Sequence, residues 1–207
     1  MNDAIHAYIL ALMRQDNAAL PELGQRYEGR TDIQSSIGPE VGKMLGFLVR
    51  TLHAQRVLEL GTCLGYSTVW LAQAVKETGG RLTSVELSHA LVEATRRSLQ
   101  DAGLLSVVDL VEGDAVMVTH DLQGPFDLIL QDSAKPLYPE LLERCVQLLR
   151  TGGILAADDA LFKPMGIPAK FTVPVHRYNE LTAADSRLYT TILPIGDGLN
   201  LSLKLHD

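Results

Sequence analysis

Two short segments of the chain carry acidic side chains in an arrangement that suits a metal ion. Asp132 and Lys135 follow the apolar run FDLILQ, and Asp158 and Asp159 follow the run ILAA. Neighbouring parallel strands lie ~4.8 Å apart, so three carboxylates at the ends of two such strands can converge. Carboxylates that converge repel one another, and a hard divalent cation relieves this repulsion. The pattern predicts a cation site made by Asp132, Asp158 and Asp159, with Mg²⁺ as the expected ion and Mn²⁺ or Ca²⁺ as alternatives.

Lys135 stands three residues after Asp132, close enough to act on an oxygen held at such a site. A lysine beside a cation and partly removed from water has a lowered pKa and can serve as a general base. A simpler interpretation stays open for the same residues. In it, Asp159 caps the next helix, Asp158 points to solvent and Lys135 is an ordinary surface lysine.

A glycine-containing loop follows a third apolar run, RVLEL. Gly61 and Gly65 allow the backbone to pass close to a ligand, and the next helix offers free N–H groups. The spacing is GxxxG and not the GxGxxG that cradles a pyrophosphate, which disfavours an NAD-dependent oxidoreductase. Glu86 ends the next run, where an acid would accept hydrogen bonds from ribose hydroxyls, and Asp114 follows the run after that. Each residue alone is an ordinary turn glycine or strand-end acid, but together they predict an adenosine-type cofactor without a diphosphate.

The elements that must position these residues alternate along the chain. Strands separated by helices are typical of βαβ units and a parallel sheet, in which ligands bind outside the carboxyl ends of the strands. Two final runs, residues 187–193 and 199–205, flank a Gly-Asp-Gly turn and predict a hairpin. The fold class is therefore α/β, with a doubly wound, mostly parallel sheet and an antiparallel C-terminal hairpin. Strands are expected over residues 56–60, 82–87, 107–112, 126–131 and 154–157, and helices over 66–76, 88–101 and 138–150.

The N-terminal part reads as a helix over residues 3–16, a polar stretch over 22–36 and a second helix that opens at Pro39. We expect one domain over residues 1–207, with an N-terminal helix and lid segment (1–36) before the catalytic core (37–207). Residues 161–172 contain two prolines and a glycine and predict a loop between the last parallel strand and the next helix.

Composition excludes several classes of protein. The chain has 207 residues, of which 46% are hydrophobic, and a formal net charge of −7, which disfavours binding to nucleic acid or to an anionic membrane surface. No apolar run approaches the ~20 residues of a membrane helix. The first residues lack the basic start of a secretory signal. Cys63 and Cys145 have no metal-site spacing and are expected as free thiols. We therefore predict a cytoplasmic protein.

Six segments of the sequence resemble, in order and spacing, the cation-dependent class I O-methyltransferases. This family includes caffeoyl-CoA and catechol O-methyltransferases and their bacterial relatives. The resemblance covers residues 33–205 and implies a Rossmann-like methyltransferase that uses S-adenosylmethionine (SAM). The segments are VLELGTCLGYSTVWLA, VEL, GDA, FDLILQDSAK followed by Tyr138, LLRTGGILAADD and LPIGDGLNLSLK.

The resemblance also implies roles for individual residues. Glu59, Gly61 and Ser67 would hold the methionine part of the cofactor, and Glu86 the ribose. Asp114 and Ala115 would border the adenine, and Ile37 would contact the cofactor from the lid side. Asp132, Asp158 and Asp159 would be the metal ligands, and Lys135 the base. The full cofactor-binding set is Ile37, Glu59, Gly61, Gly65, Ser67, Glu86, Asp114, Ala115 and Asp132.

Two positions depart from the family pattern. The third metal ligand is usually Asn and is Asp159 here, which makes the site one charge more negative. Plant and many bacterial members read D-A-D-K, where this chain has Ala134 in place of the second acid. The second departure bears on the contacts of the substrate more than on the metal ligands.

The implied reaction moves a methyl group from SAM to a hydroxyl of a catechol-like or other small phenolic acceptor. The loop over residues 161–172 lacks the aromatic or basic cluster expected for a CoA ester, which favours a compact acceptor. Family members usually form homodimers, and we expect the same here. Two further hypotheses stay open: methylation of a tRNA hydroxyuridine, which the net charge disfavours, and a SAM-binding relative without catalysis.

Overall fold

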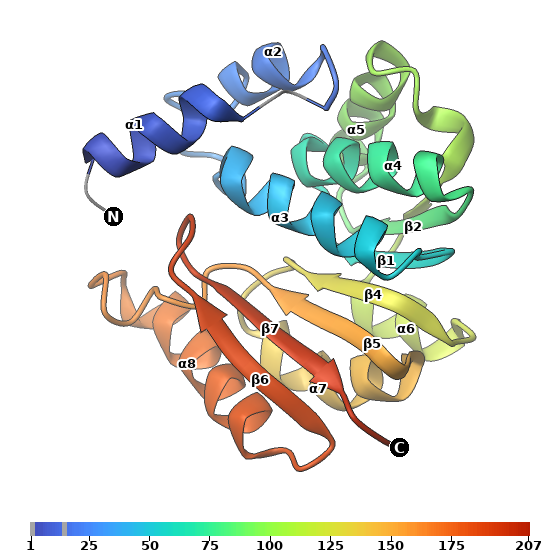
Figure 1. Ribbon diagram of the computed structural model, residues 1–207, viewed down its shortest axis with the longest axis vertical. Coiled ribbons are helices and arrows are strands. Elements are labelled where there is room, and N and C mark those ends of the chain that lie inside the picture. Colours follow the sequence, from blue (N-terminus) through green and yellow to red (C-terminus); the bar gives the residue numbers. More distant parts are fainter. Residues whose placement is uncertain (1–2, 14–15) are drawn as a thin grey trace.

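Seven strands form one sheet with the order β3-β2-β1-β4-β5-β7-β6 (Figure 1). The structure is a computed structural model and describes residues 3–13 and 16–207. Strands β1 to β5 pair in parallel, and β7 runs antiparallel to both β5 and β6. This arrangement confirms the predicted doubly wound sheet with a C-terminal hairpin. The strands are β1 (Arg56–Leu60), β2 (Arg81–Glu86), β3 (Val108–Glu112), β4 (Phe126–Gln131), β5 (Leu149–Ala157), β6 (Leu188–Leu193) and β7 (Leu199–Lys204).

Helices cover both faces of this sheet (Figure 1). One face packs against α3 (Gly38–Thr51), α4 (Tyr66–Thr78) and α5 (His89–Asp101). The other packs against α6 (Ala115–Asp121), α7 (Leu137–Leu148) and α8 (Ala169–Ala184). Two N-terminal helices, α1 (Asp3–Leu12) and α2 (Leu20–Gln25), lie beside α3 and α4, and a short 3₁₀ helix, η1 (Leu105–Val107), precedes β3.

The alternation of side chains along the central strands explains the two cores. Val57 of β1 and Leu128 of β4 belong to the core under α3 and α4, whereas Leu58 and Ile129 belong to the opposite core. Successive side chains of a strand point to opposite faces, so a strand buried on both sides needs a nearly continuous apolar run. The runs RVLEL and FDLILQ supply this requirement.

Several boundaries differ from those expected. Helix α2 lies partly within the stretch expected to be polar and irregular, and α6 begins directly after Asp114. Both helices have six or seven residues, too few to show a helical apolar period. Strand β5 begins at Leu149, so it includes the last two residues of the helix expected over 138–150. The loop expected over residues 161–172 is shorter, because α8 begins at Ala169. Residues 14 and 15 of the expected first helix lie outside the described residues.

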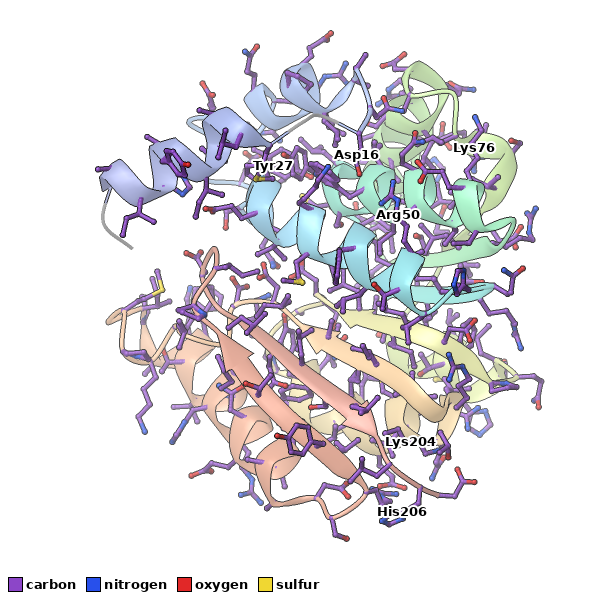
Figure 2. The ribbon with its side chains drawn as sticks, viewed as in Figure 1. Asp16, Tyr27, Arg50, Lys76, Lys204 and His206 are labelled. Carbon is purple, nitrogen blue, oxygen red and sulfur yellow. The ribbon has the colours of Figure 1, made fainter. Side chains whose placement is uncertain are left out.

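Contacts of Asp16 and Tyr27 fasten the N-terminal segment to the rest of the fold (Figure 2). A carboxylate oxygen of Asp16 lies 3.3 Å from the guanidinium of Arg50 on α3, and Asp16 also pairs with Lys43. The Tyr27 hydroxyl accepts a hydrogen bond of 3.0 Å from the backbone N–H of Leu64, in the loop after β1. The segment that follows Tyr27 is therefore held close to this loop.

Two predictions made from the composition can be compared with the structure. Cys63 and Cys145 are free thiols, as expected. Within the described residues, no helix combines the length and the apolar character needed to cross a bilayer.

Candidate active site

A cavity of about 330 Å³ opens where strands β1 to β4 end. Its lining comes from the loop after β1, the ends of β2 and β3, the segment after β4 and the N-terminal segment Asp32 to Ser35. This is the edge of the sheet at which an open α/β fold binds its ligands. Five of the nine residues assigned to the cofactor line the cavity: Gly61, Glu86, Asp114, Ala115 and Asp132.

The Glu86 carboxylate is fixed by backbone N–H groups. Its Oε2 accepts hydrogen bonds of 3.1 Å from the N–H of Thr62 and from that of Cys63, and its Oε1 accepts one of 3.0 Å from Ser88. Each carboxylate oxygen has more than one lone pair, so a ligand hydroxyl can still donate to it. Glu86 thus connects the loop after β1 to the end of β2 and presents an acceptor to the cavity.

Close backbone approaches explain the two loop glycines. Gly61 has a φ of +95°, and a Cβ there would collide with the carbonyl oxygen of Asp132. Gly65 has a φ of +90° and lies before α4, where a Cβ would come 3.1 Å from Cγ2 of Thr95 on α5. Gly61 lines the cavity, whereas Gly65 faces α5 and does not. The GxxxG spacing therefore serves packing as well as ligand access.

Asp114 combines two structural positions. Its Oδ1 accepts hydrogen bonds from the backbone N–H of Val116 at 2.8 Å and of Met117 at 3.2 Å, which makes it the N-cap of α6. Asp114 also lines the cavity together with Ala115. The cap holds the carboxylate in place at the end of β3, as the predicted border of an adenine pocket requires.

Glu59 and Ser67, assigned to the methionine part, and Ile37, assigned to the lid side, do not line the cavity. Glu59 is fully buried, and its Oε2 accepts a hydrogen bond of 2.6 Å from Ser84, while its Oε1 has no hydrogen-bond partner among the described residues. Burial raises the pKa of Glu59 to about 7, although the hydroxyls of Ser67 and Ser84 act in the opposite direction. Ser67 and Ile37 are also buried, and none of these three side chains lines the cavity. Their contact with a cofactor stays a prediction.

The three predicted metal ligands do meet. Each of Asp132, Asp158 and Asp159 offers one ligand atom, and these atoms lie within 4.8 Å of one another. Strand pairing produces this convergence, because Gln131 at the end of β4 is in register with Ala157 at the end of β5. Asp132 also lines the cavity, so the acidic cluster and the cavity share a wall.

An unusual backbone conformation lets two consecutive residues join the cluster. Successive side chains of an extended strand point to opposite faces. Asp159 has a φ of +65°, a conformation that is uncommon for residues other than glycine. The turn at Asp159 brings its carboxylate back toward that of Asp158, and both side chains are buried. The interpretation in which Asp158 faces solvent is therefore wrong.

Lys135 is not a surface residue but a buried partner of the cluster. Its Nζ lies 2.5 Å from Oδ2 of Asp159 and 3.1 Å from Oδ1 of Asp132, and it donates a 2.9 Å hydrogen bond to the Tyr138 hydroxyl. Gln34 adds a donor from the N-terminal segment, with Nε2 at 2.7 Å from Oδ1 of Asp132 and 3.4 Å from Oδ2 of Asp159. Tyr138 was recognisable only as part of a motif, and Gln34, 98 residues from Asp132 along the chain, gave no signal.

The donors leave one side of the cluster without hydrogen bonds. They converge on Oδ1 of Asp132 and Oδ2 of Asp159, and no described side chain donates to the other oxygen of either carboxylate. Oδ1 of Asp158 is buried and has no hydrogen-bond partner among the described residues. A buried carboxylate oxygen without a partner is costly, and a cation held by the three carboxylates would supply that partner. The residues present therefore suit a hard divalent ion.

Burial and the crowding of like charges shift the pKa values of the clustered side chains. Burial raises the pKa of Asp158 well above its usual range, and the charges of Asp132 and Asp159 raise it further. Burial likewise raises the pKa of Asp159 to about 6, with Lys135 opposing the shift. For Lys135, burial favours the neutral form, but the neighbouring Asp132 and Asp159 outweigh it and raise its pKa. The lowered pKa that we expected for Lys135 applies to the site with its cation bound and stays a prediction.

The strand order, the cavity at the carboxyl ends and the adjoining acidic cluster define a Rossmann-like class I methyltransferase fold. A family model described as O-methyltransferase matches residues 12–205. The chain therefore belongs to the O-methyltransferase family, which confirms the resemblance at the level of the family.

Two relatives illustrate the similarity in sequence. A catechol O-methyltransferase of Niastella koreensis is 32% identical over 166 residues, which cover 76% of this chain and 75% of the relative. A caffeoyl-CoA O-methyltransferase of Stellaria longipes is 25% identical and covers 99% of this chain and 92% of its own length.

Two solved structures illustrate the similarity in fold. The O-methyltransferase TomG of Streptomyces achromogenes, in complex with SAM, has a TM-score of 0.84 at 28% identity, covering 98% of this chain and 96% of that one. An O-methyltransferase of Bacillus cereus, in complex with S-adenosylhomocysteine (SAH), has a TM-score of 0.83 at 26% identity, with 97% of both chains covered.

Proposed function

We propose that this protein moves the methyl group of SAM to a hydroxyl of a catechol-like acceptor with the help of a divalent cation. The observation that carries the proposal is the buried cluster of Asp132, Asp158 and Asp159, whose ligand atoms lie within 4.8 Å of one another. The cluster adjoins the cavity through Asp132. A methyl donor in the cavity and an acceptor at the cluster would therefore be neighbours.

The cavity supports SAM as the donor. Its lining includes Glu86, which would accept hydrogen bonds from the ribose hydroxyls, and Asp114, which would border the adenine. Two similar structures were solved with SAM or SAH bound. In the reaction, the bond between the methyl carbon and the sulfonium sulfur breaks, a bond from that carbon to the acceptor oxygen forms, and SAH leaves.

The charge of the cluster supports a divalent ion. Three carboxylates and the single ammonium of Lys135 carry a formal charge of −2, which one divalent cation balances. When bound, such an ion supplies positive charge that lowers the pKa of Lys135 and of an acceptor hydroxyl. We propose Mg²⁺, held by Asp132, Asp158 and Asp159.

Lys135 is our candidate for the base. In the cation-bound site Lys135 would be the neutral amine, and the lone pair of its Nζ would accept the proton of the acceptor hydroxyl. In the structure the hydrogen bond to Tyr138 holds the ammonium at the cluster. The three N–H groups of the ammonium match the three partners that surround it, so Lys135 has one defined position. Proton transfer from a reacting oxygen requires a base that is held in a fixed position.

A compact phenol fits the acceptor side better than a CoA ester. The segment after β5 carries no cluster of basic or aromatic residues, and the relatives named above act on a catechol and on caffeoyl-CoA by name. The net charge of −7 favours a small acceptor over RNA. Homodimer formation and a cytoplasmic location stay predictions of the same proposal.

An acceptor panel tests this function. We would measure SAH release from SAM with Mg²⁺ and with catechol, its mono-O-methyl ether, phenol or a transfer RNA as acceptor. The proposal predicts turnover with catechol that is far above turnover with the mono-O-methyl ether or phenol, because only vicinal hydroxyls can reach one cation together. Equal turnover of phenol and catechol, or turnover of the RNA alone, would contradict it.

A further inference from the structure

Gln34 is the described residue of the N-terminal segment whose side chain reaches the acidic cluster. Its amide donates to Oδ1 of Asp132 at 2.7 Å and lies 3.4 Å from Oδ2 of Asp159. Gln34 belongs to the stretch Asp32 to Ser35, which lines the cavity. One residue thus touches the proposed donor site and two of the three proposed metal ligands.

The main chain of Gln34 is also tied to the cofactor side. Its carbonyl oxygen accepts a hydrogen bond from Sγ of Cys63 at 3.7 Å, in the loop after β1. Tyr27, seven residues earlier, is held to the same loop through Leu64. A ligand that brings the stretch Asp32 to Ser35 closer to this loop would therefore also bring the Gln34 amide closer to the carboxylates of Asp132 and Asp159.

The Gln34 amide leaves carboxylate oxygens of the cluster available to a cation. It shares Oδ1 of Asp132 and Oδ2 of Asp159 with Lys135, and the described residues leave Oδ2 of Asp132 and the buried Oδ1 of Asp158 without donors. A hydrogen-bond donor on one oxygen of a carboxylate fixes the orientation of the group, and so the direction in which its other oxygen points. Outer partners of this kind raise the affinity of a metal site, and losing one typically costs about 10–100-fold.

We propose that Gln34 couples the cation site to the donor cavity, so that cation and cofactor each strengthen the binding of the other. The inference rests on the proposed function, because it takes SAM and a divalent cation as the two ligands. Gln34 would act as a positioning residue, because its side chain contacts the proposed metal ligands Asp132 and Asp159 and not the reacting atoms. Coupling between two binding sites is reciprocal, so both affinities change by the same factor.

The test measures binding and not turnover. The affinity for SAH is determined by calorimetry with Mg²⁺ and with EDTA, and the affinity for Mn²⁺ by electron paramagnetic resonance with and without SAH. Three proteins are compared: wild type, Gln34→Met and Ser36→Ala. Methionine keeps the length of the side chain and removes both N–H donors. Ser36 lies two residues away, does not line the cavity and has no hydrogen bond to the cluster among those of the described residues.

We expect Mg²⁺ to raise the SAH affinity of wild type and of Ser36→Ala by about 5-fold or more, and SAH to raise the affinity for Mn²⁺, which stands in for Mg²⁺, as well. In Gln34→Met we expect both factors to fall close to one, with SAH still bound. A Gln34→Met protein that keeps the wild-type factor overturns the inference and leaves the proposed function standing. The same holds if wild type binds SAH and Mn²⁺ independently. If wild type binds neither, the proposed function fails and the inference fails with it.

Discussion

The ammonium of Lys135 lies 2.5 Å from Oδ2 of Asp159, and both side chains are almost completely buried. Asp159 stands where the cation-dependent O-methyltransferases that the sequence resembles usually carry Asn, so it adds a negative charge to the cluster. Lys135 lies against this added charge as well as against Asp132. Removing one partner of a buried ion pair leaves an uncompensated charge that typically costs about 3–5 kcal/mol. The negative charge of Asp159 is thus compensated within the site by the ammonium of Lys135.

Replacing a metal ligand should separate catalysis from cofactor binding. Asp158→Ala removes the buried carboxylate whose Oδ1 has no hydrogen-bond partner among the described residues. We expect Mg²⁺-dependent turnover to fall by about 100-fold or more, since a ligand should matter at least as much as an outer partner. The affinity for SAH, measured by calorimetry, should stay within about 3-fold, a difference under 1 kcal/mol. Equal loss of turnover and SAH binding would indicate a misfolded variant or a wrong ligand.

Replacing the proposed base should leave both binding sites in place. Lys135→Ala is expected to lower kcat by about 10²–10⁴-fold, the range that general-base catalysis contributes. SAH and Mn²⁺ should still bind, because the carboxylates remain. Steady-state kinetics and calorimetry on the same preparation check this expectation. Near-normal kcat would exclude Lys135 as the base.

A pair of glycine substitutions tests the close approach of two strand ends. Gly61 and Gly103 both have positive φ, but a Cβ at Gly61 would collide with the carbonyl oxygen of Asp132, whereas a Cβ at Gly103 meets open space. Alanine at either site is strained by its backbone, by about 1 kcal/mol or more. Gly61→Ala should therefore lower the free energy of unfolding more than Gly103→Ala does, as measured by urea denaturation. Equal losses would show that the collision relaxes without cost.

How much of this structure the sequence predicts depends on how far apart the interacting residues lie. The parallel strands, the C-terminal hairpin and the convergence of Asp132 with Asp158 follow from short apolar runs and the polar residues after them. Helices α2 and α6 do not, because six or seven residues carry too little periodicity. Gln34 could not be found at all, because its partner Asp132 is 98 residues away and a single glutamine carries no pattern.

The electrostatic state of the site is the part that spacing predicts least well. The sequence places Lys135 near Asp132, which is correct, but spacing alone does not show that the Asp159 carboxylate lies against Lys135 as well. In the structure two carboxylates lie against Lys135, and their charges outweigh burial. Similarly, nothing in the local sequence indicates that Glu59, which the resemblance assigns to the cofactor, is fully buried beside Ser84. Burial depends on what the rest of the chain packs against the residue, and local sequence does not contain this information.

The buried Glu59 carboxyl gives a pH dependence of known sign. Its pKa is about 7 in the folded protein, against an ordinary value of 4.5. Below pH 4.5 the group is protonated in both states and costs nothing. As the pH rises from 4.5 through 7 the unfolded chain ionises first, so the free energy of unfolding falls, by about 3 kcal/mol in total.

Urea denaturation of wild type and Glu59→Gln at pH 5 and at pH 8, without cofactor, isolates this contribution. Glutamine keeps an acceptor for the Ser84 hydroxyl and cannot ionise. The stability of wild type relative to the variant should therefore be higher at pH 5 than at pH 8. A difference between the two proteins that does not change with pH would mean that Glu59 ionises normally in the folded protein.

The central claim is that methyl transfer depends on a cation held by Asp132, Asp158 and Asp159. The most direct measurement is SAH release with SAM and catechol by enzyme stripped of metal with EDTA, dialysed, and then titrated with Mg²⁺. We predict no turnover above background in the stripped enzyme and full recovery that saturates with Mg²⁺. Turnover that is the same in EDTA and in Mg²⁺ would contradict the account and remove the cation from the reaction.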